Sequence, residues 1–154
     1  MGLDASTYLV MSFVTIVVLF GLGRIYFDSI QDFFLRRILY AATRLVILIQ
    51  NTGDGIYSLS WKVIRECLDD IGKDYQQLRL EEIFEKLFIA LNHRKDNVQY
   101  TANPALEERV IIQAIHIATV WKMSIRSELE KMERMFNLKV DVKKFIQLID
   151  EFEI

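Results

Sequence analysis

The sequence predicts an all-α membrane protein in three consecutive parts: a single N-terminal transmembrane helix, a cationic amphipathic juxtamembrane helix, and a small cytoplasmic helical bundle with one long helix. We place these parts at residues 1–27, 28–50 and 51–154. Three observations predict this class. Residues 5–23 carry no charge, apolar residues then recur at helical spacing, and the 154 residues include one proline and six glycines. A chain so poor in helix-breaking residues is expected to form long helices.

The N-terminal anchor is predicted from its length and its flanks. Residues 5–23 lie between Asp4 and Arg24. A helix from Tyr8 to Tyr26 is about 27 Å long, close to the ~30 Å hydrocarbon core of a bilayer, and places a tyrosine at each interface. A core helix is rarely uncharged over this length, and a signal peptide would carry a basic start and a small-residue cleavage site. We therefore predict one membrane span.

The basic residues near the span indicate its orientation. Four arginines follow it, namely Arg24, Arg36, Arg37 and Arg44. The preceding segment offers only Asp4 and the amino terminus. Because basic flanks are retained in the cytoplasm, we predict a single-pass protein with its N-terminus outside and its C-terminus in the cytoplasm.

The first six residues, MGLDAS, match the pattern for N-myristoylation at Gly2. Acylation occurs on the cytoplasmic side, so this interpretation conflicts with the predicted orientation. Such a short pattern often arises by chance, and one acyl chain adds little to a chain that already holds a membrane span. We interpret the match as a coincidence and keep acylation as the alternative.

Residues 33–50, FFLRRILYAATRLVILIQ, are nearly as apolar as the span. Their ten Leu, Ile, Val and Phe residues would favour membrane insertion by about 3 to 6 kcal/mol, whereas three arginines would oppose it by about 7.5 to 10.5 kcal/mol. We therefore predict an amphipathic helix, with Arg36, Arg37, Tyr40 and Arg44 on one face. These arginines and Arg24 are candidates for contact with membrane lipid. The opposite apolar face either lies in the lipid interface or packs on the helices that follow.

The remaining chain reads as a turn and four helices. The turn is NTGDG at residues 51–55, whose glycines suit positive backbone φ angles and which lacks the lysine and spacing of a phosphate-binding loop. Helices are predicted at residues 56–74, with Gly72 as C-terminal cap, and at residues 78–94. A long helix begins at Asn103 and Pro104 and ends near Phe136, and a short closing helix starts at an Asp141 cap. Trp61 falls off the apolar stripe of its helix, which makes it a candidate for lipid or protein contact.

The second half of the long helix is the predicted partner interface. The first half has a wide apolar face, but the second half has a row one or two residues wide, flanked by charges of both signs. The residues of this row are Ile125, Leu129, Met132 and Phe136. We predict that the row binds a second copy of the chain or another subunit.

Nothing in the sequence predicts catalysis or a cofactor. The 19 Lys and Arg residues against 21 Asp and Glu residues give a net charge of −2, which does not favour nucleic-acid binding. Cys67 lies on an apolar stripe without a neighbouring histidine, so we expect it to be buried and inert. His116 is interpreted as a packed histidine, because no metal-binding spacing surrounds it. We expect no catalytic residue, no metal site and no cofactor.

These observations favour a non-catalytic accessory or scaffold subunit of a membrane complex that holds a helical interaction domain at the membrane face. Its expected partners are membrane lipid and, through the long helix, a protein partner or a second copy. The alternative is a membrane-perturbing protein of the small phage or toxin type that acts as an oligomer. A membrane-bound enzyme of unknown type is the third hypothesis.

Overall fold

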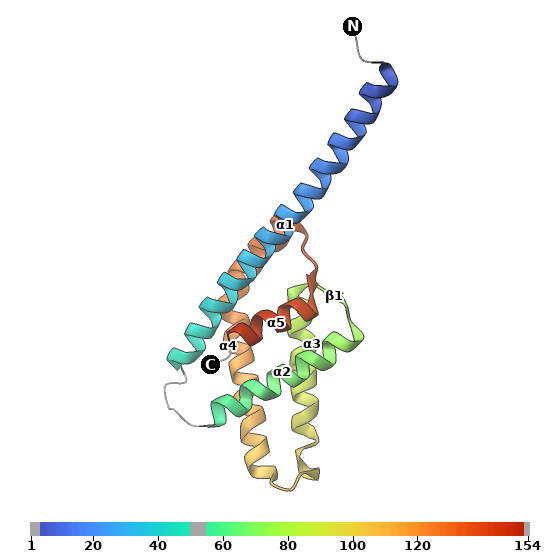
Figure 1. Cartoon of the computed structure of the whole chain (residues 1–154). Coiled ribbons are helices and arrows are strands. Elements are labelled where there is room, and N and C mark those ends of the chain that lie inside the picture. The colour runs from blue at the N-terminus through green and yellow to red at the C-terminus, as the bar shows by residue number, and fades with distance from the viewer. Residues whose placement is uncertain (1–3, 50–54, 153–154) are drawn as a thin grey trace. The chain divides into compact units, whose positions relative to one another are not determined.

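A computed structural model of the chain describes residues 4–49 and 55–152. Most of the turn predicted at residues 51–55 and the acylation pattern at Gly2 lie outside the described residues. The described chain is helical almost throughout (Figure 1). It forms α1 (Ala5–Ile49), α2 (Ile56–Asp74), α3 (Leu80–Asp96), a 3-10 turn η1 (Val98–Tyr100), α4 (Pro104–Phe136) and α5 (Val142–Glu151), with two short strands, β1 (Gln77–Leu78) and β2 (Val140–Asp141). The all-α class is therefore confirmed.

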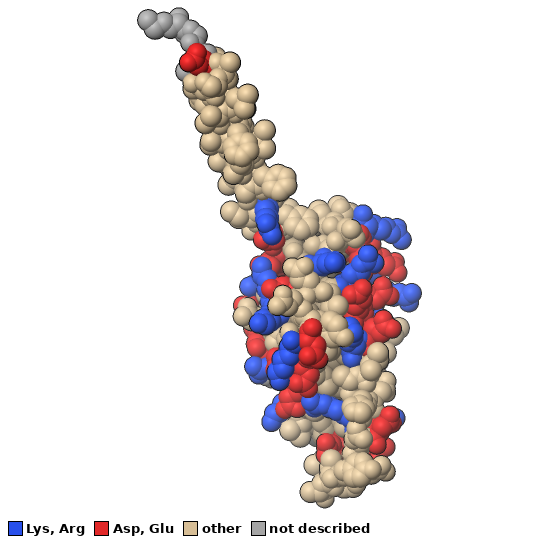
Figure 2. Space-filling view, turned by 90° about the vertical axis from the view of Figure 1, so that its right-hand side faces the viewer, with Lys and Arg blue, Asp and Glu red and all other residues tan. Residues whose placement is uncertain are grey.

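The chain divides into two compact units, Met1–Arg36 and Arg37–Ile154. The first unit consists mainly of the N-terminal part of α1, where the side chains of residues 5–23 are all exposed. Figure 2 shows this stretch as a surface without charged side chains. Within the described part of the chain, α1 is the one helix that is long and apolar enough to cross a membrane.

Helix α1 continues without a break from the first unit into the second. The segments predicted as anchor and juxtamembrane helix are thus parts of one helix. Beyond Arg37, the side chains of Ile38, Leu39, Ala42 and Val46 are buried. This burial answers the question that the sequence left open for these four side chains, because they pack within the protein.

The unit Arg37–Ile154 is a small helical bundle around α4. This helix contacts both α2 and α3, and α2 also contacts α3 and α5. The hydroxyl of Ser60 on α2 donates to the carbonyl of Val110 on α4 at 3.2 Å, inside the interface between the two helices. Arg94 on α3 pairs with Glu66 on α2 at 3.0 Å, nearer the surface.

The predicted helix boundaries agree closely with the structure. Helix α2 covers residues 56–74 and α4 ends at Phe136, both as predicted. The Asn103 side chain accepts a hydrogen bond from the backbone of Leu106, and the Asp141 side chain accepts one from the backbone of Lys143. Both predicted N-caps are therefore confirmed.

Helix α3 begins two residues later than predicted, because the chain before it forms a strand pair that the sequence analysis missed. Gln77 pairs with Asp141 and Leu78 with Val140 in an antiparallel arrangement. This pair ties the start of α3 to the start of α5. Each of these strands is only two residues long. That is too short to show the alternating pattern from which a strand is predicted.

The prediction that Gly72 caps α2 was wrong. The helix continues to Asp74, and Gly72 is buried where α2 approaches α5. A Cβ atom at this position would lie 3.3 Å from Ile146 Cδ1 and 3.4 Å from Val142 Cγ1. The glycine is explained by this close approach, not by a turn.

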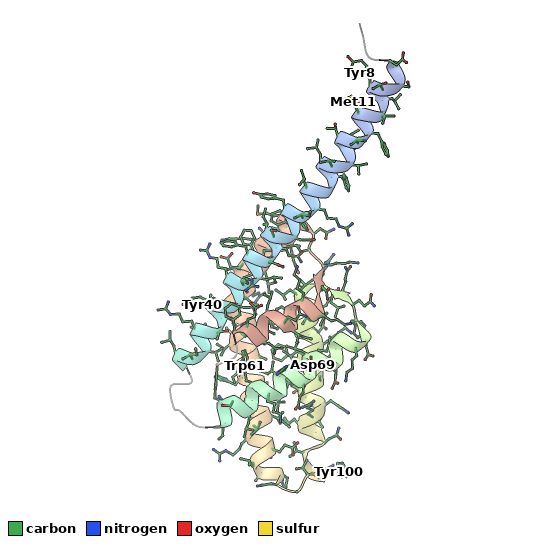
Figure 3. The ribbon with its side chains drawn as sticks, viewed as in Figure 1. Tyr8, Met11, Tyr40, Trp61, Asp69 and Tyr100 are labelled. Atoms are coloured by element: carbon green, nitrogen blue, oxygen red, sulfur yellow. The ribbon has the colours of Figure 1, made fainter. Side chains whose placement is uncertain are left out.

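The prediction that Trp61 faces lipid or a partner was also wrong. Its indole is 5 % exposed, and its ring centroid lies 5.5 Å from that of the fully buried Trp121. Trp121 also contacts Phe84 of α3 at 5.4 Å and stacks on Phe145 of α5 at 5.8 Å. These aromatic rings form the centre of the core, and Figure 3 marks Trp61 at its α2 side.

Candidate functional site

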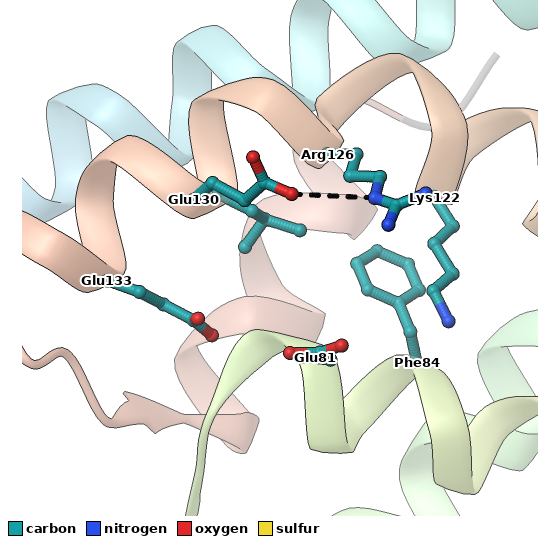
Figure 4. A pocket seen from close by; sticks show the side chains of 7 residues that line it. Glu81, Phe84, Lys122, Arg126, Glu130 and Glu133 are labelled. Atoms are coloured by element: carbon teal, nitrogen blue, oxygen red, sulfur yellow. Dashed lines mark ion pairs between the residues drawn. The ribbon is translucent and has the colours of Figure 1, made fainter.

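A groove between α3 and α4 combines apolar and charged side chains in its lining. It encloses a hollow of about 210 Å³ (Figure 4). Phe84 of α3 and Leu129 of α4 provide its apolar lining. Its charged residues are Glu81 from α3 and Lys122, Arg126, Glu130 and Glu133 from α4. Because α3 and α4 run in opposite directions, the start of α3 lies against the second half of α4 (Figure 1).

Three of the charged groups in the groove already contact another side chain. Arg126 pairs with Glu130 at 3.5 Å, an exposed contact one turn apart on α4. The Lys122 ammonium lies 5.5 Å from the centroid of the Phe88 ring, within the ~6 Å range of a cation–π contact. Exposed pairs of this kind contribute little to stability, about 1 kcal/mol or less. The two remaining charged groups of the groove are the carboxylates of Glu81 and Glu133.

Glu133 carries the most unusual atom of the groove. Its Oε1 is inaccessible to water and accepts no hydrogen bond from the described residues. In Figure 4 the Glu133 and Glu81 side chains extend from facing helices toward the same space. A buried acceptor left without a donor typically costs about 1–3 kcal/mol, and more if it is charged. The groove therefore contains one carboxylate oxygen that is buried and has no donor among the described residues.

A second hollow of about 260 Å³ continues the groove along α4, since Glu130 and Glu133 line both. Its other lining residues are Arg79, Arg134, Asn137 and Leu138. Asn137 adopts a left-handed conformation with φ of 47° and ends α4. The second hollow thus presents two arginines beside the two glutamates that it shares with the first.

The structure places most of the predicted partner row in the interior. Ile125 is 1 %, Leu129 8 % and Met132 5 % exposed, and Phe136 is half-buried. Leu129 is the member of the row that also lines the groove. Binding of a partner through the row stays a prediction. Burial gives these apolar side chains a structural role that is sufficient to explain them.

The four arginines proposed for lipid contact all lie on α1 and are exposed. Arg24 and Arg36 belong to the first unit, and Arg37 and Arg44 to the second. Tyr40, which helical spacing places on the same face as Arg37 and Arg44, is 58 % exposed. Its ring centroid lies 6.4 Å from that of Phe152. Lipid contact by the arginines stays a prediction.

The residues considered for other chemistry are scattered. Cys67 is buried, and this burial raises the pKa of its thiol, which fits an inert residue. His116 is exposed, so the packed environment predicted for it was wrong. His93 contacts the Asn97 side chain at 3.2 Å at the end of α3. Among the described residues, no three His, Cys, Asp or Glu side chains are placed to hold a metal ion.

Sequence reasoning did not find the groove. Neither Glu81 nor Glu133 was among the candidate residues that it named. A weak signal is Lys122, a charged residue that lies three positions before Ile125 and so continues the spacing of the row, as expected at a boundary between core and surface. No known family, curated protein or solved structure matches the chain.

Proposed function

We propose that the chain is a non-catalytic, membrane-anchored accessory or scaffold subunit, which presents the helical unit Arg37–Ile154 to partners at the cytoplasmic face of a membrane. The observation that supports this proposal is α1, which joins an uncharged, exposed stretch to a folded bundle in one helix. Leu9 and Phe20 in that stretch are 74 % and 79 % exposed. Lipid would remove such side chains from water at a gain of about 25 cal/mol per Å² of apolar area.

The anchor and its orientation can be tested with a reporter. A reporter active only in the cytoplasm, fused after Ile154, should give a signal if the C-terminus is inside. Single cysteines at positions 40 and 44, in a Cys67→Ser background, should react with a membrane-impermeant reagent only from the cytoplasmic side. An expressed, full-length fusion without signal would contradict the orientation.

The scaffold role itself is tested by native purification in mild detergent. A scaffold should co-purify reproducibly with defined membrane subunits, whose stoichiometry with the chain can be measured. Recovery of the chain alone, from a membrane fraction in which it is correctly folded, would contradict this role.

A membrane-perturbing protein is the second candidate, because α1 exposes apolar side chains close to its arginines. Leu48 is 68 % exposed near Arg44, and Tyr40 lies between Arg37 and Arg44. Such a surface is typical of helices that bind anionic lipid. Dye release from anionic liposomes separates the two candidates. A scaffold should release little dye, whereas release that is lost when Arg36, Arg37 and Arg44 become glutamine would favour the second candidate.

A further inference from the structure

We propose that the groove between α3 and α4 binds an arginine side chain of a partner protein, with Glu133 and Glu81 as its acceptors. The inference rests on the proposed interaction role for the source of the arginine, but it is independent of the membrane anchor and its orientation. It specifies which side chain of the partner would make one contact with the chain.

The first argument is the unmatched carboxylate. Glu133 Oε1 is buried without a donor among the described residues, and the Glu81 carboxylate belongs to the lining of the same hollow. The charged neighbours Arg126 and Lys122 are already engaged by Glu130 and by the Phe88 ring. A cation that enters the hollow would lie beside the carboxylates of Glu81 and Glu133 without breaking these contacts.

The second argument is the shape of the acceptor set. Glu81 and Glu133 come from two facing helices, so one ligand must offer donors in more than one direction (Figure 4). A guanidinium has five N–H donors in a rigid plane, whereas an ammonium is a compact point charge. The apolar lining of Phe84 and Leu129 suits the methylene stem of an arginine.

The third argument is size and continuity. A hollow of about 210 Å³ is smaller than the ~300–1,000 Å³ of most small-molecule pockets, but it has room for one long side chain. It continues into the second hollow, where Arg79 and Arg134 would pair with a carboxylate at the end away from the shared Glu130 and Glu133. A protein segment with an arginine followed by an acidic residue matches this order of charges. A small free amine would leave the second hollow unused.

The test uses the full chain in detergent micelles and N-acetyl-arginine amide as the probe, followed by NMR of the backbone amides. We expect binding in the millimolar range, with shifts centred on Glu81, Leu129 and Glu133. N-acetyl-citrulline amide, which replaces the guanidinium by a neutral urea, should bind at least tenfold more weakly. Equal binding of the two probes would overturn the proposal.

Variants identify the acceptors. Glu133→Gln should weaken binding of the arginine probe about tenfold or more, and Glu81→Gln should also weaken it. Glu108→Gln, at an exposed position of the same helix, is the matched control and should bind like the parent chain. Circular dichroism checks that each variant is folded. Unchanged binding by both folded groove variants would overturn the proposal, as would an equal loss in the control.

A final arm distinguishes the source of the cation. Spermidine supplies ammonium groups on a free polyamine, and the capped arginine amide supplies a side chain as a protein would. Tighter binding of the arginine amide supports a protein source. Binding of spermidine alone would overturn it and would leave the scaffold proposal to its own test by co-purification.

Discussion

The two halves of α4 differ in the width of their apolar face, but apolar side chains of both halves are buried. In the first half the apolar face is wide, and Ile111, Ala114 and Trp121 are 1 % exposed or less. In the second half the apolar row is narrow and charges flank it, yet Ile125 and Met132 are buried as well. The difference lies in what surrounds each half. Rings from α2, α3 and α5 surround Trp121, while the charges beside the narrow row line a groove.

The width of an apolar stripe therefore does not identify an interface. A narrow stripe shows that a helix is covered along one line, but it does not show whether the cover comes from the same chain or from another. In α4 the flanking charges are the more informative feature. They mark where the helix leaves the core and lines the groove.

Trp121→Ala should be the most damaging change, because it empties the centre of the first half. Replacing a fully buried tryptophan by alanine typically costs about 3–5 kcal/mol through lost burial and the cavity that remains. Urea unfolding of the full chain in detergent, followed by far-UV circular dichroism, measures the loss. A change of less than about 1 kcal/mol would mean that the aromatic centre is not the main core of the bundle.

Leu129→Ala should cost about 2–3 kcal/mol, near the lower end for buried leucines, since Leu129 borders the groove and is 8 % exposed. Burial also changes the expected result of Leu129→Glu. Placed on a free interface, this substitution would release a partner without affecting stability, but here it should unfold or strongly destabilise the chain. Full stability of a folded Leu129→Glu chain would show that the row is available to a partner.

The sequence predicted the helices far better than the contacts between them. Asn103 and Pro104 announce the start of α4, and an apolar period near 3.6 residues marks each amphipathic helix, so local chemistry was sufficient for these elements. The location of Trp61 and the close approach at Gly72 were mispredicted. Both depend on which helix lies opposite, and helical periodicity carries no information about the neighbour.

The groove could not be predicted from the sequence for the same reason. Glu81 and Glu133 line one hollow only because α3 and α4 run in opposite directions with one particular offset. A glutamate on a helix surface is most often solvated, so neither residue stands out by itself. The membrane span and the lipid contacts of the arginines likewise remain predictions, since they concern an environment that the chain alone does not contain.

Trp121→Phe should cost much less stability than Trp121→Ala. Comparing the two variants separates the contribution of the ring volume from that of the indole nitrogen. The Trp121 indole nitrogen is buried without a hydrogen-bond acceptor among the described residues, so its loss removes an unmatched donor. Phenylalanine keeps most of the ring volume, and we expect a cost below about 1.5 kcal/mol. A loss as large as that of the alanine variant, in the same urea experiment, would indicate that the nitrogen makes an essential hydrogen bond.

Met123→Ala should have the smallest effect, and its matched partner is Met132→Ala on the same helix. Met123 is 73 % exposed and Met132 is 5 % exposed, so one substitution removes little buried area and the other leaves a cavity. We expect Met123→Ala to change stability by no more than about 0.5 kcal/mol, and Met132→Ala to cost about 2 kcal/mol or more. The same urea unfolding measures both. Because residue type, helix and replacement are identical, burial is the main variable in this pair. Equal costs would mean that the second half of α4 is not packed as the structure shows, and the narrow row would again become a candidate for a partner.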